Sequence, residues 1–339
     1  MKNFETLDQF RQACLDLSSQ DDVSEQATYE KQKTLLKPPG SLGELENLVG
    51  WLAAWQNKPN PTLDRVCMMI FAGNHGVTAE NVTPYPASIT ELMVAQINQG
   101  GAAINQLVKN ANAELRVIPV NNLEPTANIT QAPAMTEKQF LQAVEAGYNA
   151  VTPNIDLLCL GEVGIGNTTI AAALSAALFG GDGSQWVSKG TSTAAEHTIN
   201  KQKAVDKALA LHESFLHDPL ETCRRLGGYE HAALLGAVLA ARHLNIPVLL
   251  DGFVCTAAIA ALQKLNPVGL DHTKISHLSA EKGHLLLAGN LGLYPLIAFN
   301  MRLGEGTGAA TVVPLLKGAL ACYTGMNSYQ DAGLPSPQS

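Results

Sequence analysis

A single glutamate stands among glycines in the segment MRLGEGTGAA, residues 301–310. Glycine offers no side chain for packing and loses more conformational entropy on folding than any other residue. The chain nevertheless surrounds Glu305 with Gly304, Gly306 and Gly308. A carboxylate in such a loop has almost nothing local to pack against, so the role of Glu305 has to be argued from the whole chain.

A second glycine-rich segment, residues 155–179, reads as a buried strand, a loop and a helix that begins near Asn167 and Thr168. Free backbone N–H groups and the positive end of the helix dipole make this arrangement a natural phosphate site. It is not a Walker A loop, because no Gly-Lys-Ser/Thr follows, and its glycine order differs from the dinucleotide-binding fingerprint. A tight turn with an Asn or Thr cap is the structural alternative.

Glu162 lies in the same loop, and its carboxylate would repel the anion that the loop attracts. A substrate that carries a phosphate together with a cationic or proton-losing group would reconcile the two, and a pyridinium nucleotide fits that description. The alternative is that Glu162 points into solvent. A further glycine loop, SKGTST at 188–193, precedes Lys201, which either binds a phosphate or faces solvent as helical lysines commonly do.

Two other polar residues follow expected strands. His75 in GNHGV either forms hydrogen bonds with backbone groups or takes part in catalysis. Asp251 in LLDGF either takes part in the reaction or caps the next helix. Three further histidines lack HExxH or clustered Cys/His spacing, so we predict no metal site among them: His272, His277 and His284. No GxSxG is present, which argues against an α/β-hydrolase nucleophile.

The elements that must position these residues alternate between strands and helices. Strands are predicted at 66–72, 115–120, 155–160, 185–188, 247–250 and 274–278, and most are continuous apolar runs, which is typical of a parallel sheet covered on both faces. Helices are predicted near 88–109, 137–149, 168–179, 194–216, 230–243, 254–265, 280–291, 293–301 and 309–323. This alternation predicts a doubly wound α/β sheet. Ligands bind beyond the carboxyl ends of such strands, where the glycine-rich segments fall.

The chain ends differ from this core. Residues 1–58 are predicted to be helical, with apolar residues at helical spacing in 4–17 and 42–55. Pro38 and Pro39 interrupt the helices, because proline cannot sit inside one. The tail NSYQDAGLPSPQS is predicted to be disordered.

Bulk properties exclude several classes of partner. The chain has 339 residues, is 46% hydrophobic and 15% charged, and has a formal net charge of −8, which argues against nucleic-acid and anionic-membrane surfaces. The six cysteines are scattered and form no CxxC pair, as in reduced cytosolic proteins. The N-terminus lacks the apolar core of a signal peptide, and the apolar run at 232–241 is too short to span a bilayer. We therefore expect a soluble cytoplasmic protein.

Six segments together resemble one family. LLKPPGSLGELE, FAGNHGV, GEVGIGNTT, PVLLDGF, SAEKG and MRLGEGTGAA occur in that family's order, between about residues 35 and 320. On these motifs the chain is similar to the nicotinate-nucleotide–dimethylbenzimidazole phosphoribosyltransferases, the CobT family of cobalamin assembly. KPPGSLG and RLGEGTG are the most specific of the six.

The resemblance implies a reaction and an architecture. The family moves the 5-phosphoribosyl group of nicotinate mononucleotide onto 5,6-dimethylbenzimidazole, giving nicotinate and α-ribazole 5′-phosphate with inversion at the anomeric carbon. It implies a cytoplasmic homodimer that uses no cofactor and no metal and binds neither nucleic acid nor membrane. A Rossmann-like large domain, 59–308, would be accompanied by a small helical domain formed by 1–58 and 309–339.

The resemblance also assigns roles to residues. Glu305 matches the general base, and Glu162 matches the glutamate that faces the reaction centre. The phosphate-binding region matches Gly164, Gly166, Asn167, Thr168, Gly190 and Lys201. The base pocket matches Tyr85, Pro86, His75, Asp251, Leu303 and Gly304. In the family a serine can occupy the position of Tyr85, and an aspartate can occupy the position of Asn74. These two departures leave open which aromatic base the pocket prefers.

Other functions compete with this one. Another N-glycosyl transfer, by a nucleoside phosphorylase or by an enzyme that uses phosphoribosyl pyrophosphate, is the main enzymatic rival. A nucleotide- or azole-binding sensor on the same fold would not need Glu305 in a glycine-framed loop. A degenerate family member with altered activity is the third reading, and the intact GEVGIGNTT and RLGEGTG segments argue against it.

Overall fold

A single parallel sheet organises the molecule in the computed structural model, which describes residues 1–188 and 195–335. Its strands are β1 Val66–Ala72, β2 Glu114–Pro119, β3 Leu157–Val163, β4 Val248–Leu250 and β5 Thr273–Ile275. They lie in the order β2-β1-β3-β4-β5, and every pair is parallel. The predicted doubly wound α/β fold is confirmed, and its strand order is the flavodoxin-like one rather than the Rossmann order.

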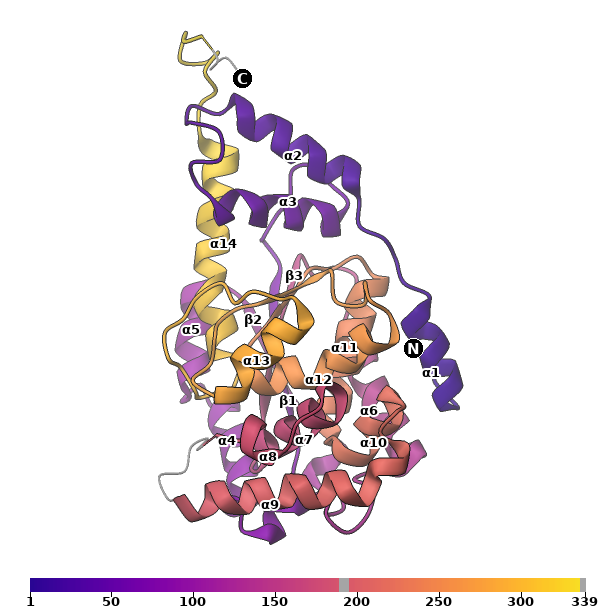
Figure 1. Cartoon of the computed structure of the whole chain (residues 1–339). Helices are drawn as coiled ribbons and strands as arrows, with labels where there is room; N and C mark the ends of the chain where they lie inside the picture. The colour runs from indigo at the N-terminus through magenta and orange to yellow at the C-terminus, as the bar shows by residue number, and fades with distance from the viewer. Residues whose placement is uncertain (189–194, 336–339) are drawn as a thin grey trace.

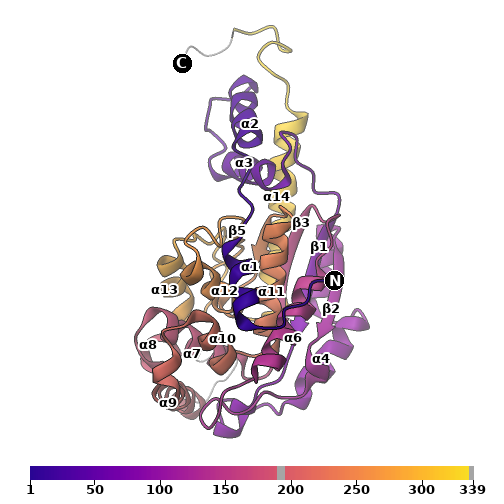
Figure 2. The ribbon, with the colours of Figure 1, turned by 90° about the vertical axis from the view of Figure 1, so that its right-hand side faces the viewer.

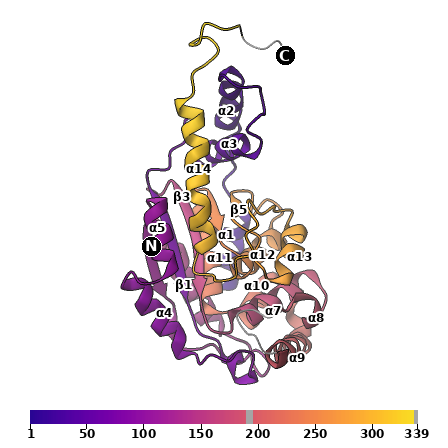
Figure 3. The same cartoon turned by 90° about the vertical axis from the view of Figure 1, so that its left-hand side faces the viewer.

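Helices cover both faces of this sheet, which explains why β1 is apolar at every position. Met68 and Ile70 face one side, in the core that α5 Ala103–Ala111 and α14 Thr307–Gly325 share. Met69 and Phe71 face the other side, toward α6 Glu137–Ala150 and α11 Tyr229–His243. In Figure 3, α14 runs upward from this body beside α5. The remaining helices near the sheet are α4 Ser88–Asn98, α7 Asn167–Phe179, α9 Ala195–His212, α10 Pro219–Leu226, α12 Phe253–Leu265 and α13 Lys282–Leu291, with short 3-10 turns at η1 Gly76–Glu80, η2 Asn121–Leu123 and η3 Glu213–Phe215.

Some predicted elements are wrong. The first two residues of the predicted strand 185–188 belong to the short helix α8 Gly183–Trp186, in which the Asp182 side chain accepts hydrogen bonds from the first backbone amides, and the other two form no strand. The predicted helix 293–301 is an irregular segment instead, with Asn300 at a φ of 55°. The backbone amides of Leu296 and Ile297 donate to the carbonyls of Ile275 and Ser276, so this segment follows the end of β5.

Two predicted helices are divided, and one helix was missed. The expected helix 88–109 is α4 and α5, separated by a turn in which Gly100 has a φ of 83°. The expected helix 194–216 is α9 followed by η3, and residue 194 lies outside the described residues. Helix α10 went unpredicted, although Asp218 caps it and Pro219 opens it, which is a typical helix start.

The chain ends form a second packing unit above the sheet (Figure 1). Helices α2 Asp22–Thr34 and α3 Glu44–Gln56 pack on the second half of α14 around Leu35, Val49, Ala319 and Tyr323. Helix α1 Leu7–Leu15 instead lies against α6 and α12 of the sheet-bearing body (Figure 2). The division into a domain at 59–308 and a helical domain at 1–58 plus 309–339 stays a proposal.

The C-terminal tail is ordered where it is described. The amide of Leu36 donates to the carbonyl of Asn327, and the amide of Tyr329 donates to the carbonyl of Thr34. Predicted disorder is therefore wrong for residues 327–335, and residues 336–339 lie outside the described part. Among the described helices, none has the length and apolarity that crossing a bilayer requires.

Candidate active site

A cavity of about 370 Å³ opens at the carboxyl ends of β3, β4 and β5. The ends of three strands, the N-terminus of α7 and the loop before α14 form its wall. Most sequence-predicted site residues line it: Glu305, Glu162, Gly164, Gly166, Asn167, Thr168, Lys201, Tyr85, Asp251, Leu303 and Gly304. Parallel strands bring these segments to one sheet edge, although they are far apart in the chain.

The loop that carries Glu305 has an uncommon backbone. Gly304, Glu305 and Gly306 have φ values of 82°, 62° and 78°, so three successive residues adopt left-handed conformations. A glutamate in this region is rare and costs free energy, and such strain concentrates at functional sites. The Glu305 amide donates to the carbonyl of Glu162 at 3.0 Å, which fixes the two glutamates at neighbouring backbone positions.

The glycines around Glu305 permit close backbone contact as well as positive φ. A Cβ on Gly161 of β3 would overlap the backbone of Gly306, and one on Gly304 would lie 2.8 Å from Oε1 of Glu162. A Cβ on Gly306 would lie 2.5 Å from Sδ of Met68. The loop therefore lies directly against the end of β3, and the buried Glu305 side chain is only 5% exposed.

Asp251, directly after β4, holds the same loop from the other side. Its Oδ2 accepts a hydrogen bond from the Gly306 amide at 3.0 Å, and its Oδ1 accepts from the amides of Gly308 at 2.7 Å and Ala309 at 3.3 Å. Asp251 is thus a helix cap, but for α14 rather than for the next helix, α12. The carboxylate ties the start of α14 to the sheet and fixes the entry of the Glu305 loop.

Glu162 points into the protein rather than into solvent. Its Oε2 accepts a short hydrogen bond from Nδ2 of Asn167, the first residue of α7. Burial raises the pKa of Glu162 well above its usual range, and the nearby charges of Asp251 and Glu230 raise it further. The pKa of Glu305 is also raised, by burial and then by Asp251. Both of these carboxyl groups in the cavity therefore hold protons more tightly than free glutamates do.

The part of the cavity at the start of α7 suits an anion. Gly166, with a φ of 95°, is the N-cap of α7, so the helix presents its first amides beside Asn167 and Thr168. Nζ of Lys201, from α9, donates to Oγ1 of Thr168 at 2.9 Å. Lys201 is buried, and burial lowers the pKa of its ammonium while Glu281 partly offsets this effect. A buried cation at a helix N-terminus is a favourable phosphate-binding arrangement.

Among the described residues, two predicted site residues do not line this cavity. Pro86 is next to the wall residue Tyr85 but is outside the wall, and Gly190 lies outside the described residues. His75 is fully buried behind the wall, where its Nε2 is 2.6 Å from Oε1 of Glu230. His75 therefore contacts a carboxylate, which neither interpretation of the sequence anticipated.

Several wall residues were missed at the sequence level. Ser279 and Glu281 lie in the SAEKG segment, and Arg302 is three residues before Glu305 in its motif, so both motifs contained a signal. Burial raises the pKa of Glu281, and the charge of Lys201 partly offsets it. Phe253 and His277 also line the cavity. Phe253 is the last residue of the PVLLDGF motif, and His277 was considered only as a metal ligand, so their place in the wall follows from how β4 and β5 end.

Comparisons with known proteins identify the family of this chain. A family model described as phosphoribosyltransferase matches residues 17–334. The nicotinate-nucleotide–dimethylbenzimidazole phosphoribosyltransferase of Mesorhizobium japonicum is 54% identical over 98% of both chains, and that of Brucella anthropi is 47% identical over 96% of both. The crystal structure of CobT from Thermus thermophilus superposes with a TM-score of 0.86 at 37% identity, covering 93% of this chain and 100% of that one. This chain belongs to the nicotinate-nucleotide–dimethylbenzimidazole phosphoribosyltransferase family.

Proposed function

We propose that this enzyme transfers the 5-phosphoribosyl group from nicotinate mononucleotide to 5,6-dimethylbenzimidazole in cobalamin assembly. The products are nicotinate and α-ribazole 5′-phosphate, with inversion at the anomeric carbon. The observation that carries the proposal is one cavity lined both by a strained, buried carboxylate and by a buried lysine at a helix N-terminus. The names of the relatives supply the two substrates.

The phosphate of the nucleotide binds at the α7 end. Backbone amides of the Gly164–Gly166 loop and the Lys201 ammonium donate to its oxygens, and Thr168 holds the lysine in place. Gly190 completes this region in the proposal. Burial and the nearby charges of Asp251 and Glu230 raise the pKa of Glu162 well above its usual range, which favours the neutral form of this carboxyl group beside the phosphate. This shift reduces the conflict between a carboxyl group and an anion site.

The reaction takes place at the Glu305 end. One benzimidazole nitrogen attacks the anomeric carbon as the bond from that carbon to the pyridinium nitrogen breaks, and the electron pair of that bond leaves with nicotinate. The new bond makes the benzimidazole ring cationic, so the proton on its other nitrogen becomes acidic. Glu305 accepts that proton as general base. Attack on the face opposite the leaving group produces inversion.

The aromatic acceptor occupies the less polar wall of the cavity. Tyr85, Leu303 and Phe253 line this part, together with Ile89 and Met93 of α4. The backbone between Gly304 and Gly306 brings the carboxylate of Glu305 close to a flat ring without side chains in between. Tyr85 adds a phenol that a serine at this position lacks, so it narrows the slot and influences which base is accepted.

We also propose that the enzyme is a cytoplasmic homodimer. Cys14, Cys67, Cys159, Cys223 and Cys255 are buried free thiols and Cys322 is a partly buried one, as expected in a reducing compartment. Tyr294 and Phe299 are 84% and 63% exposed, and a second subunit would cover such apolar side chains in the proposed dimer. Light scattering behind size-exclusion chromatography distinguishes a dimer of this 35.9 kDa chain from a monomer.

Product analysis tests the activity. The purified protein is mixed with both substrates, and both products are separated by chromatography and their anomeric configuration is read by NMR. We expect nicotinate and α-ribazole 5′-phosphate to appear in equal amounts, with the α configuration only. If no product formed at any pH or with any azole base tested, the fold assignment would stand and the proposed transferase activity would be refuted.

A further inference from the structure

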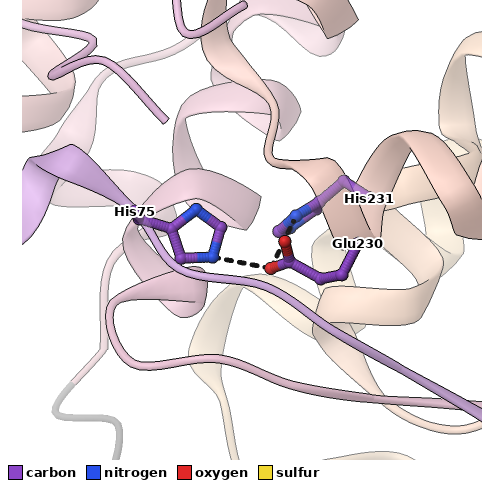
Figure 4. Close-up of side chains that lie close together, drawn as sticks. All are labelled: His75, Glu230 and His231. Atoms are coloured by element: carbon purple, nitrogen blue, oxygen red, sulfur yellow. Dashed lines mark ion pairs between the residues drawn. The ribbon is translucent and has the colours of Figure 1, made fainter. Parts of the chain in front are cut away.

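Three ionisable side chains meet behind the cavity wall, outside the residues that line the cavity. His75 follows β1, while Glu230 and His231 lie in the first turn of α11, and we call the three residues the Glu230 cluster. Figure 4 shows their side chains pointing toward one another. Oε1 of Glu230 is 2.6 Å from Nε2 of His75 and 3.1 Å from Nδ1 of His231. All three side chains are at most 2% exposed, so bulk solvent does not reach them.

The polar atoms of this cluster form no hydrogen bonds within the described part of the chain. Both ring nitrogens of His75 and of His231 lack a partner, and so do both carboxylate oxygens of Glu230. The short distances between nitrogen and oxygen are not hydrogen bonds, because neither ring N–H is directed at the oxygen beside it. Native proteins pair nearly all buried polar groups, so six unpartnered atoms in one place indicate a bound group.

Two imidazoles and one carboxylate are a donor set that binds divalent transition metals. Imidazole nitrogen suits zinc, copper, iron and nickel, whereas magnesium and calcium take oxygen ligands. Two histidines and a glutamate hold zinc in several known enzymes. The cluster offers one donor atom from each residue within a distance of 4.8 Å. With the second oxygen of Glu230 it supplies four ligand atoms, which is the number that structural zinc sites use.

Small side-chain movements bring these atoms to coordination distance. Zinc lies about 2.0–2.2 Å from nitrogen and oxygen ligands, so two ligands of a tetrahedral ion are roughly 3.3 Å apart. The 3.1 Å between His231 and Oε1 of Glu230 is already close to that spacing. The ring of His75, at 2.6 Å, has to move away from the same oxygen by less than about 1 Å to reach it.

Glycines from three segments surround the cluster and keep other side chains out of it. A Cβ on Gly73 would overlap Oε2 of Glu230. One on Gly228 would overlap the ring of His75. One on Gly164 would lie 3.2 Å both from Oε1 of Glu230 and from Nε2 of His75. Because Gly164 also lines the cavity, an ion held by the cluster lies directly behind the loop that is proposed to bind phosphate.

We propose that the Glu230 cluster is a structural zinc site, in which His75, Glu230 and His231 bind one zinc ion. The ion joins the segment after β1 to the start of α11 and gives the facing nitrogen and oxygen atoms the partner that they lack. It touches no substrate, because the cluster lies outside the residues that line the cavity. The resemblance to the family implies an enzyme without a metal, and the inference departs from that expectation. It does not rest on the proposed transfer reaction.

Metal analysis of the full-length protein, purified without an affinity tag, tests the proposal in the absence of substrate. The protein is produced in medium supplemented with zinc, desalted and measured by inductively coupled plasma mass spectrometry. We expect one zinc ion per chain. A chain that holds no transition metal, even after incubation with excess zinc and desalting, would overturn the inference. That result would leave the transferase proposal untouched, because no turnover is measured.

His231→Asn removes one ligand, and His212→Asn is its matched control. His212 is equally buried, but it lies outside the Glu230 cluster, and its Nε2 is 3.0 Å from the carbonyl oxygen of Ile129. We expect the zinc affinity of His231→Asn to fall more than about 100-fold, beyond the 10- to 100-fold that loss of a residue supporting a ligand costs. His212→Asn should bind zinc as the wild type does. Equal zinc contents in the two variants would contradict the assignment.

Two measurements on the wild type keep the test independent of whether a variant folds. Anomalous X-ray diffraction at the zinc absorption edge should show a peak between His75, Glu230 and His231. A peak elsewhere, or a water molecule that hydrogen-bonds to the three side chains at this position, would refute the zinc site. Thermal unfolding tests the structural role, since an ion that binds only the folded state stabilises it. Removal of zinc by a chelator should lower Tm and added zinc should restore it, and an unchanged Tm after complete removal would contradict that role.

Discussion

Replacement of Asp251 by asparagine is expected to weaken the fold and at the same time to extend activity to lower pH. The carboxylate accepts three hydrogen bonds from the amides at the start of α14. Asparagine keeps one acceptor oxygen, and its NH₂ group then faces an amide that also donates. Hydrogen bonds to charged groups contribute about 1.5–3 kcal/mol each, so the loss of one or two of them lowers the free energy of unfolding by roughly 2–4 kcal/mol.

Although Asp251→Asn lowers the free energy of unfolding, it is expected to widen the pH range in which the enzyme is active. Asp251 helps to raise the pKa of Glu305, so its neutralisation lowers that pKa. The proposed base works only when ionised, and activity is lost as pH falls through the Glu305 pKa. The low-pH limb of the rate profile therefore moves to lower pH in Asp251→Asn, whatever the absolute rate.

Urea unfolding and the pH dependence of kcat/KM measure the two effects. Asp64→Asn is the matched control, because Asp64 is an exposed carboxylate just before β1, at the other end of the sheet. It should change neither the urea midpoint nor the low-pH limb. An unchanged midpoint in Asp251→Asn would refute the capping argument, and a low-pH limb that moved to higher pH would refute the electrostatic one.

The remaining predictions concern backbone approach and phosphate binding. Gly161→Ala places a methyl group against the backbone of Gly306, so it should cost about 1–3 kcal/mol of stability and reduce kcat even in molecules that remain folded. Gly289→Ala, at a helical position with open space, should instead stabilise by about 0.5–1 kcal/mol, and thermal unfolding compares the two. Lys201→Met should raise the KM for nicotinate mononucleotide roughly 10- to 100-fold, the equivalent of one charged hydrogen bond, while stability is kept because the buried charge is lost. Lys203→Met on the exposed side of the same helix should leave KM unchanged, and equal effects of the two would contradict the phosphate assignment.

The sequence predicts the sheet because its signal is local. The run VCMMIFA is apolar at every position, which only a strand covered on both faces requires, and it forms β1 with all seven residues buried. The run 293–301 is also apolar, yet its amides pair with the residues that end β5. Hydrophobic periodicity does not reveal this pairing, because the hydrogen-bond acceptors belong to a different segment of the chain.

The same limit applies to the site. Glycines around Glu305 and before α7 mark a functional loop, since each position has few structural uses. The sequence does not tell which backbone those glycines approach, and Gly161 meets Gly306 only because β3 ends beside the loop. Asp251 was placed correctly after a strand, but the helix that it caps begins far along the chain. His75 and Glu230 come together through the fold alone.

The most direct test of the account is the turnover of Glu305→Gln with both substrates saturating, measured beside the wild type. The variant keeps the size of the side chain and removes only its ability to accept a proton. The account predicts a kcat that is about 10²- to 10⁴-fold lower, the usual contribution of a positioned general base. It also predicts that the dissociation constant for nicotinate mononucleotide changes by no more than about threefold, because the lost interaction belongs to the transition state. Near-normal turnover in Glu305→Gln would contradict the assignment of Glu305 as the base.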